Sequence, residues 1–364
     1  MSKKPTSMKI FFIIKGLNYS GGTERVTAIF SKALIDRGHQ VQIVSIVGKG
    51  ENPFFAFDKK VIRHYLEGPK SSGLPIVRDI RRVRLMKNLF AKEKPDIIII
   101  VDAGRSFVNI PATRGFTTIT WEHFNVNTNW HLMHSLSRKI AVKHSDMIVT
   151  LTQGDVEAYQ KKFGAKKVIS IPNPITVDVS EKTPMKENRV LAVGRIVDQK
   201  GFDLLVKAWH IAHPKAPDWK LRIVGAGKLQ QDLEKLIQSL GVSESVEILP
   251  PTRDVVSQYK QASIFALSSR HEGLPLVLIE AMAMGLPAVS FDCETGPRDI
   301  VIDGETGILV PPQDIDKMAA GLVDLMTNTE KRKKFSQKAI EASAKFGIEA
   351  IVDQWEALFK QLKS

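Results

Sequence analysis

Long apolar runs are missing from this 364-residue chain. The longest continuous ones, at 10–14 and 97–101, are about five residues, far fewer than the ~20 that a membrane-spanning helix needs. We therefore expect no transmembrane helix. The segment 1–8 is polar and carries Lys3 and Lys4, and the apolar run that follows it is too short for a signal peptide.

Cysteine is nearly absent as well, since Cys293 is the only one in the chain. A single cysteine excludes an internal disulfide and fits a reducing compartment. Stability must therefore come from apolar cores, and a chain of this length can bury two of them. We expect two domains of similar size and a cytoplasmic location.

Acidic residues are scarce in the first half only. Residues 1–173 contain 28 Lys and Arg against 13 Asp and Glu, whereas residues 174–364 contain 24 against 26. The basic excess, +13 for the whole chain, thus belongs to the first half. Such a one-sided positive field indicates a surface for anionic membrane lipid, a phosphorylated substrate or nucleic acid. A solvated basic face without a partner is the alternative.

The first half alternates patterns of buried strands and amphipathic helices. A Gly-rich turn at 20–23 joins the first strand to the first helix, which is typical of a βαβ unit. Helices are expected at 26–38, 76–92 and 133–144. Strands are expected at 9–14, 41–47, 96–101, 116–120 and 146–151.

Residues 171–188 carry several prolines and mixed charge, which is typical of a linker, and the alternation restarts after them. An amphipathic helix at 348–362 closes the chain. The second half is expected to hold strands at 190–193, 221–224, 246–249, 264–267 and 288–291, with helices at 202–212, 229–240, 255–262 and 276–284.

The predicted fold class is therefore α/β, with two Rossmann-like parallel-sheet domains facing a central cleft. We place the first domain at 1–173 and the second at 174–347, and we expect the helix at 348–364 to pack back on the first.

A Gly-rich turn after the strand at 190–193 carries two cations. Gly194 and Arg195 follow that strand, and Lys200 and Gly201 precede the next helix. The cations and the free N–H groups of the helix start would face one anionic group, for which a diphosphate is the natural occupant. Ordinary surface cations beside a glycine turn are the alternative.

A second motif places two carboxylates seven residues apart around the start of a helix. Glu272 lies in a Gly-Pro turn, in which Gly273 permits close backbone approach and Pro275 suits a first helical position. The N–H groups after Glu272 would face a phosphate, and Glu280 could accept two hydrogen bonds from a ribose diol. Two solvated acids are the alternative, although carboxylates in such apolar surroundings are costly without a partner.

These motifs together resemble the retaining family-4 glycosyltransferases of the GT-B fold, along essentially the whole chain. The resemblance is carried by Gly194-Arg195 with Lys200-Gly201, by 224–227, by Glu272 with Glu280, and by 304–310. It implies that Arg195 and Lys200 bind the donor diphosphate, that Glu272 lies beside the donor sugar and that Glu280 holds the ribose. It further implies a metal-independent reaction without a cofactor. The nucleotide-binding residues implied in this half are Gly194, Arg195, Lys200, Gly225, Gly273, Leu274, Pro275, Leu276 and Glu280.

In the first half the resemblance is looser. Gly21 and Gly22 stand where family members have a Gly-rich loop that approaches the donor phosphate. His123 follows a predicted strand, as does the family histidine that reaches the donor sugar, and is therefore a candidate catalytic residue with Glu272, Arg195 and Lys200. A structural, hydrogen-bonding histidine is the alternative.

The expected helix at 76–92 has both a basic and an apolar side. Ile76, Ile80, Val83, Met86 and Phe90 form a stripe that would enter the core. The cations, of which four are Arg78, Arg81, Arg82 and Arg84, would then face anionic lipid or a lipid pyrophosphate.

The function that these observations predict is transfer of a sugar from a nucleotide-sugar donor, with UDP favoured by family frequency. The acceptor expected from the resemblance is a glycan or lipid-linked glycan of bacterial capsule or exopolysaccharide assembly, reached from the inner face of the cell membrane. A basic two-domain nucleic-acid-binding protein would use the first half as a phosphate footprint, but it leaves Glu272 and Glu280 unexplained. Another nucleotide-sugar enzyme, such as an epimerase, or a phosphorylase is the nearer alternative.

Overall fold

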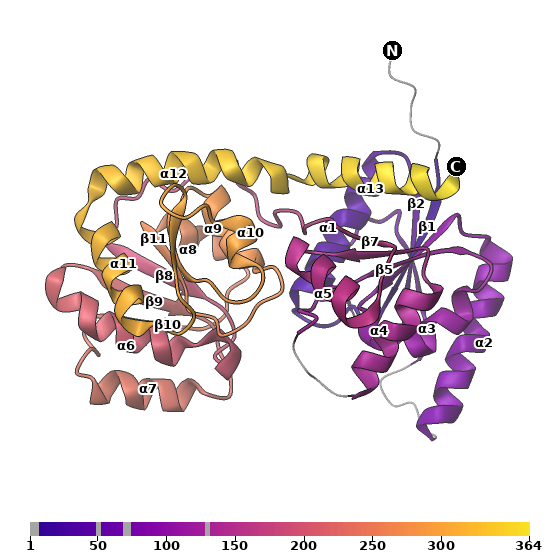
Figure 1. The fold of residues 1–364 in the computed structure, drawn as a ribbon, viewed down its shortest axis with the longest axis horizontal. Coiled ribbons are helices and arrows are strands. Elements are labelled where there is room, and N and C mark those ends of the chain that lie inside the picture. The colour runs from indigo at the N-terminus through magenta and orange to yellow at the C-terminus, as the bar shows by residue number, and fades with distance from the viewer. Residues whose placement is uncertain (1–6, 49–51, 68–73, 128–131) are drawn as a thin grey trace, which may run out of the picture. The chain divides into compact units, whose positions relative to one another are not determined.

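In the computed structural model the chain divides into two compact units, each built on one sheet of parallel strands (Figure 1). Unit 1 comprises Met1–Pro174 and Ile348–Ser364, and unit 2 comprises Ile175–Gly347. The structure describes residues 7–48, 52–67, 74–127 and 132–364.

Sheet A of unit 1 has seven strands in the order β3-β2-β1-β4-β5-β6-β7, and every neighbouring pair is parallel. Apolar residues on both faces bury β1 and β4, and Ile10 lies opposite Val41 on one side and Ile97 on the other. The strands are β1 (Lys9–Ile14), β2 (Gln40–Ser45), β3 (Ile62–Tyr65), β4 (Ile97–Val101), β5 (Thr117–Trp121), β6 (Met147–Thr150) and β7 (Val168–Ser170).

The helices of unit 1 connect these strands and cover the sheet. Phe11 of β1 packs edge-on against Phe90 in the core beneath α2. The helices are α1 (Gly22–Asp36), α2 (Pro75–Glu93), η1 (Ala103–Arg105), α3 (Ser106–Thr113), α4 (Leu132–His144), α5 (Gln153–Phe163) and α13 (Ile348–Lys363).

Helix α13 belongs to unit 1 although unit 2 precedes it in sequence. Trp355 is fully buried, with its ring centroid 5.2 Å from that of Phe30 and 5.0 Å from that of Trp121. Arg37, just after α1, donates to the Glu349 carboxylate at 2.6 Å. Aromatic packing and ion pairing therefore both hold α13 against the first segment.

Sheet B of unit 2 has six strands in the order β10-β9-β8-β11-β12-β13, again all parallel. The strands are β8 (Arg189–Val193), β9 (Lys220–Val224), β10 (Val246–Leu249), β11 (Ile264–Leu267), β12 (Ala288–Phe291) and β13 (Gly307–Val310). The helices are η2 (Asp198–Lys200), α6 (Phe202–Ala212), η3 (His213–Lys215), α7 (Gln230–Ser239), α8 (Val255–Lys260), α9 (Leu276–Ala283), α10 (Pro297–Ile300), α11 (Ile315–Thr327), α12 (Thr329–Ser343) and η4 (Ala344–Phe346).

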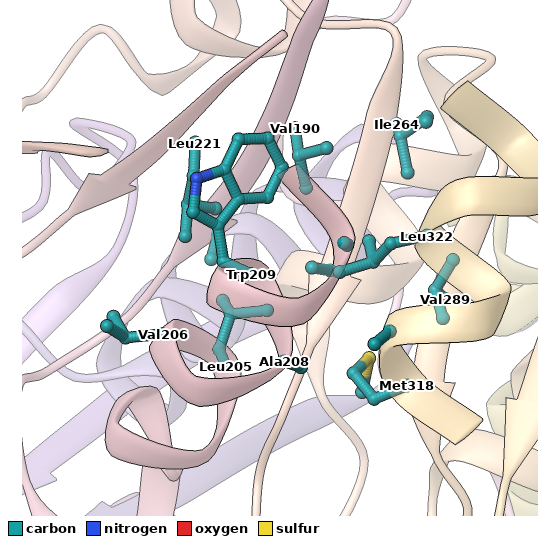
Figure 2. Packing of buried hydrophobic residues seen from close by; sticks show 14 of the residues in the cluster. Val190, Leu205, Val206, Ala208, Trp209, Leu221, Ile264, Val289, Met318 and Leu322 are labelled. Atoms are coloured by element: carbon teal, nitrogen blue, oxygen red, sulfur yellow. The ribbon is translucent and has the colours of Figure 1, made fainter. Parts of the chain in front are cut away.

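The core of unit 2 lies between sheet B and helices α6 and α11. Trp209 of α6 and Leu322 of α11 point toward the sheet, where Leu221 and Ile264 meet them (Figure 2). The Trp209 indole donates to the Ser245 hydroxyl at 3.0 Å, so this buried N–H is satisfied.

Helix α2 departs from the expected apolar stripe. Met86 and Phe90 are buried as predicted, whereas Ile76 and Ile80 have 69% and 65% of their surface exposed. The prediction that the whole stripe enters the core is therefore wrong for the first half of the helix. Periodicity identifies residues on one face, but burial also requires a neighbouring element along that stretch.

Arg82 also differs from the expectation, because it faces the protein and not the solvent. Its guanidinium is buried and donates to Glu67 at 2.8 Å and to Asp79 at 2.6 Å. Arg82 is thus neutralised by internal carboxylates and is not available to lipid.

Among the described residues, no helix is long and apolar enough to span a bilayer.

Candidate functional site

The carboxyl end of sheet B has a point at which the strand order reverses. Strands β8, β9 and β10 follow one another in one direction from the centre, and β11, β12 and β13 follow in the other. In open parallel sheets, ligands bind outside the carboxyl ends of the two central strands, where the loops diverge. Here those loops are residues 194–200 after β8 and residues 268–275 after β11.

Lys200 and Glu272 meet at this point. The Lys200 ammonium donates to the Glu272 carboxylate at 2.6 Å, and the Ser269 hydroxyl donates to the same oxygen at 2.6 Å. The Ser268 hydroxyl also donates to the backbone carbonyl of Lys200 at 2.9 Å. The two loops are thus tied together, and the structure brings these two predicted catalytic residues into direct contact.

Close backbone approach explains the glycines of this site. A Cβ on Gly225, in the loop after β9, would stand 1.8 Å from the Gly194 carbonyl oxygen. Gly201 has φ +59, and a Cβ there would stand 2.1 Å from the carbonyl oxygen of Ser268. Both distances exclude any side chain without displacement of the backbone. Glycine therefore lets the loops after β8, β9 and β11 pack backbone to backbone.

Helix α9 begins at the predicted phosphate-binding turn. Its N-cap is Pro275 and its first residue is Leu276. The proline therefore lies one residue before the first helical position, where the sequence predicted it. Gly273 lies against Gly296, where a Cβ would stand 2.3 Å from the Gly273 carbonyl oxygen, and Leu274 is buried. No side chain caps the helix start. First-turn N–H groups of α9 are thus oriented toward the same edge as Lys200.

Two further cations differ in their surroundings. Arg195 is exposed just after the carboxyl end of β8. Arg270 instead forms two hydrogen bonds with the Asp203 carboxylate, at 2.9 and 2.8 Å. Arg270 therefore fixes the loop to α6, and its pKa is raised by that bond.

Glu280 occupies a less open position than the sequence indicates. Only 1% of its surface is exposed. Tyr259 donates to one carboxylate oxygen at 2.8 Å, and the Thr176 hydroxyl donates to the other. These bonds satisfy the buried charge from inside unit 2, so that Glu280 supports α9 from within.

The chemistry available at sheet B follows from these groups. Lys200, Arg195 and the first-turn N–H groups of α9 supply positive charge and dipoles at one edge. Such a fixed array stabilises an anionic leaving group without solvent reorganisation. Glu272 adds a carboxylate at the centre of the array, where it accepts from Lys200 of one loop and from Ser269 of the other.

The first of the two central loops at the carboxyl end of sheet A follows β1. Gly21 is the N-cap of α1 and Gly22 its first residue, so the predicted glycines form a helix start. A Cβ on Gly21 would stand 2.4 Å from the Glu24 carboxylate, which is buried and has a pKa raised by desolvation. An anion at this helix start would therefore lie beside a carboxyl that protonates more readily than usual.

His123 follows β5 at the same edge. It is 9% exposed, and its ring centroid lies 4.4 Å from that of Trp121. Burial lowers its pKa to about 3, and its Nε2 has no partner within the described part of the chain. The imidazole is therefore neutral at physiological pH and has one nitrogen left to hydrogen-bond a ligand.

A buried polar cluster next to His123 was not predicted from the sequence. Glu122 accepts hydrogen bonds from Arg138 at 2.8 Å and from Tyr159 at 2.8 Å. Asp102 follows β4 with φ +80, and burial together with the nearby Glu122 charge raises its pKa to about 6. The signal for Asp102 was a carboxylate directly after the apolar run 97–101. Arg138 and Tyr159 gave no such signal, because they are distant in sequence.

No group of His, Cys, Asp and Glu suited to a metal ion occurs among the described residues. One Asp-x-Asp triplet is present, at Asp314 and Asp316. Asp314 caps α11 by accepting from the Lys317 N–H at 3.0 Å, and Asp316 lies in the first turn. Both carboxylates therefore take positions that helix starts favour.

Comparison with protein families gives two matches. Residues 176–342 match the model described as glycosyl transferases group 1, and residues 20–179 match that of glycosyltransferase family 4. An uncharacterized glycosyltransferase of Haemophilus influenzae is 37% identical over 96% of this chain and 99% of its own length. The amylovoran biosynthesis glycosyltransferase AmsD of Erwinia amylovora is 33% identical over 95% and 98%.

A third relative is named for a specific activity. It is the GalNAc-alpha-(1->4)-GalNAc-alpha-(1->3)-diNAcBac-PP-undecaprenol alpha-1,4-N-acetyl-D-galactosaminyltransferase of Campylobacter jejuni, which is 28% identical over 98% of this chain and 99% of its own length. Among solved structures, TarM superposes with a TM-score of 0.84 at 17% identity, over 97% of this chain and 99% of that one. Anabaena HepE in complex with UDP and glucose gives 0.80 at 18%, over 97% and 100%. These matches confirm the predicted α/β architecture of two Rossmann-like domains.

Proposed function

Because the chain belongs to the glycosyltransferases of group 1, we propose that it transfers a hexosyl or N-acetylhexosaminyl group from a UDP-sugar to a glycan or lipid-linked glycan. The observation that carries the proposal is the contact of Lys200 with Glu272 where the strand order of sheet B reverses. A diphosphate bound there meets fixed positive charge on several sides.

The residues of unit 2 take the following roles in the proposed reaction. Lys200 and Arg195 hold the two phosphates, and the N–H groups at the start of α9 receive the charge that develops as the glycosidic bond breaks. Glu272 hydrogen-bonds the donor sugar from the loop that it shares with Ser269. When the diphosphate arrives, Lys200 exchanges part of its contact with Glu272 for the phosphate. No metal ion or cofactor is required in this scheme.

Retention of anomeric configuration is part of the proposal. The name of the Campylobacter relative specifies an alpha linkage. An α-configured nucleotide sugar yields an α-linked product only when configuration is retained. Departure of the diphosphate and attack of the acceptor on the same face would then share one set of stabilising groups, and the leaving phosphate itself can take the acceptor proton.

UDP and a lipid-linked acceptor are supported by the relatives. The HepE structure contains UDP, and the acceptor named for the Campylobacter enzyme is a glycan on undecaprenyl diphosphate. AmsD is named for the biosynthesis of amylovoran. We propose an acceptor of the same kind, met at the inner face of the cell membrane by a peripheral enzyme, and no role for nucleic acid.

Calorimetric titration tests the donor site. UDP should bind wild-type protein, and Lys200→Ala should weaken that binding by roughly 10-fold or more, because a charge-assisted bond contributes about 1.5–3 kcal/mol. Lys235→Ala, an exposed lysine on α7, is the matched control and should bind as wild type does. Equal UDP affinity in all three proteins would reject the site.

Donor hydrolysis then identifies the sugar. A panel of UDP-, GDP- and ADP-sugars, each followed by release of the nucleotide, should show one preferred UDP-sugar.

Single-stranded DNA is the second titrant in the calorimetric experiment. Tight, salt-sensitive binding of DNA without any nucleotide-sugar turnover would favour the nucleic-acid-binding alternative over the transferase.

A further inference from the structure

The Nε2 atom of His123 has no hydrogen bond that would orient the ring. Within the described part of the chain this buried nitrogen lacks a partner, and the ring packs on Trp121 with the centroids 4.4 Å apart. The place of Nε2 is therefore set by the backbone that carries the ring. That backbone is the segment 122–126, which follows β5 at the carboxyl edge of sheet A.

Glu122 holds the start of this segment. Its carboxylate is buried, and one oxygen accepts from the Phe124 N–H at 3.1 Å. The other oxygen accepts from Arg138 of α4 and from the Tyr159 hydroxyl of α5, both at 2.8 Å. The carboxylate thus closes a turn around His123 and ties that turn to two helices.

Arg138 holds the end of the same segment. While its Nε donates to Glu122, its Nη1 donates to the Val126 carbonyl at 3.2 Å and its Nη2 to the Asn125 carbonyl at 3.4 Å. A guanidinium presents these donors in one rigid plane. One side chain of α4 therefore fixes the distance between the two ends of the segment that carries His123.

Asp155 of α5 holds Val126 through its other backbone group. The Asp155 carboxylate accepts from the Val126 N–H at 3.1 Å and from the Thr152 hydroxyl at 2.7 Å. Burial raises the pKa of this carboxyl to about 6. Both polar backbone groups of Val126 are thus bonded to side chains, the carbonyl to α4 and the N–H to α5.

Stability alone is a weak reason to bury these charges. Apolar side chains of similar size often give equal or greater stability than a buried ion pair. A polar network whose members are all bonded provides one defined geometry instead. The bonds of Glu122, Arg138 and Asp155 converge on the backbone next to His123.

We propose that Glu122 and Arg138 are positioning residues, which keep the Nε2 atom of His123 where it hydrogen-bonds a hydroxyl group of the sugar substrate. This inference rests on the proposed function, which supplies the sugar. Neither residue touches the substrate, and both act through the backbone of 122–126. The precision matters, because a displacement of about 1 Å at a reacting group can lower the rate about 100-fold.

Arg138→Lys separates the charge from the geometry. The lysine keeps a positive charge beside Glu122, but one ammonium cannot replace a planar group that bonds Glu122 and two carbonyls. We expect kcat for UDP-sugar hydrolysis to fall about 10- to 100-fold. UDP affinity should stay at the wild-type value, because the proposed UDP site lies in unit 2.

Arg332→Lys is the matched control. Arg332 of α12 is also buried and also donates to two backbone carbonyls, those of Leu325 at 2.6 Å and Met326 at 2.9 Å. Both substitutions should lower the melting temperature, but Arg332→Lys should leave kcat unchanged, since its carbonyls belong to the end of α11. An equal fall of kcat in the two variants would assign the effect to destabilisation and overturn the positioning role.

Tyr159→Phe tests whether the network acts through His123. The phenylalanine keeps the ring and removes one hydrogen bond to Glu122, and it should lower kcat by roughly threefold to tenfold. In a His123→Ala background the same change should alter kcat less than about twofold, because the group that is positioned is no longer there. The full effect in that background would contradict the proposal.

The ring itself is observed by NMR of protein labelled at the histidine ring carbons. The His123 signal is assigned by its loss in His123→Ala. It should move in Arg138→Lys and in Glu122→Gln, whereas the signal of His210, on α6 of unit 2, should not.

This measurement is independent of turnover. A wild-type protein that hydrolyses no UDP-sugar would count against the proposed function, and the His123 signal would still report the positioning. An unmoved His123 signal in both variants overturns the inference, and so does a moved signal in variants that keep the full kcat.

Discussion

Removal of the Glu280 carboxylate should destabilise unit 2. A residue that only contacts a ligand could be replaced without loss of stability. Its two oxygens accept from Tyr259 and Thr176 in surroundings that leave 1% of the residue exposed. Two charge-assisted bonds of about 1.5–3 kcal/mol each sum to about 3–6 kcal/mol. Removal of the carboxylate also removes the unfavourable free energy of burying its charge, which offsets part of that loss. We expect Glu280→Ala to lower the stability of unit 2 by about 2–4 kcal/mol.

Hydrogen exchange measures this effect where it arises. A two-domain chain need not unfold in one step, so the opening free energy is taken from peptides that cover α9 and β11. Peptides from β1 and α1 in unit 1 serve as an internal control and should exchange as in wild type. UDP affinity is measured on the same samples.

Glu280→Gln is the matched variant. The glutamine keeps the volume and one carbonyl oxygen, and its NH₂ group can donate to a hydroxyl, so the cost should be about 1 kcal/mol. Unchanged exchange of α9 in Glu280→Ala, together with loss of UDP affinity, would refute the reasoning. Glu280 would then be a ligand group without a structural role.

Three more outcomes are expected. Gly225→Ala should abolish UDP binding and destabilise unit 2 by at least about 1–3 kcal/mol, because a Cβ 1.8 Å from the Gly194 carbonyl oxygen forces the two backbones apart. Gly194→Ala is the control and should have a mild effect, since its Cβ would meet only the Lys200 side chain at 3.3 Å. Similar destabilisation by both substitutions would contradict the packing argument. Nitrogen NMR should show His123 to be neutral at pH 5. Because its pKa of about 3 in the folded protein lies below the unfolded value, its contribution to stability should be lost as pH falls from about 6.5 toward 3. A titration midpoint near 6.5 would show that the imidazole is open to solvent. Transfer should persist in EDTA, and strict dependence on added Mn²⁺ would exclude the metal-independent scheme.

Local patterns predicted most of the strands and helices. Continuous apolar runs such as 97–101 are fully buried strands, and glycines such as Gly38 and Gly164 end helices with positive φ. The short strands β3, β7 and β13 were missed. Strand β3 reads Ile-Arg-His-Tyr at the sheet edge, where one-sided contact leaves no strong apolar signal.

Contacts between distant residues set the limit for the site. The spacing of Glu272 and Glu280 indicated two functional carboxylates, but the environment of Glu280 depends on Thr176 and Tyr259, which no local pattern connects to it. Arg82 likewise counted as a surface cation until its partners were placed. Sequence gave the chemical groups near the site, whereas burial and pairing required the assembled sheet.

The placement of α13 reverses the usual order of folding during synthesis. Domains generally fold as units, the N-terminal one first as the ribosome releases the chain. Unit 2 is continuous in sequence and can close once residue 347 has emerged, whereas unit 1 has to wait for residues 348–364. Until then Phe30 and Trp121 lack the Trp355 ring, and Arg37 lacks Glu349. A nascent unit 1 therefore lacks the aromatic cover that α13 gives to Phe30 and Trp121 until translation has passed unit 2.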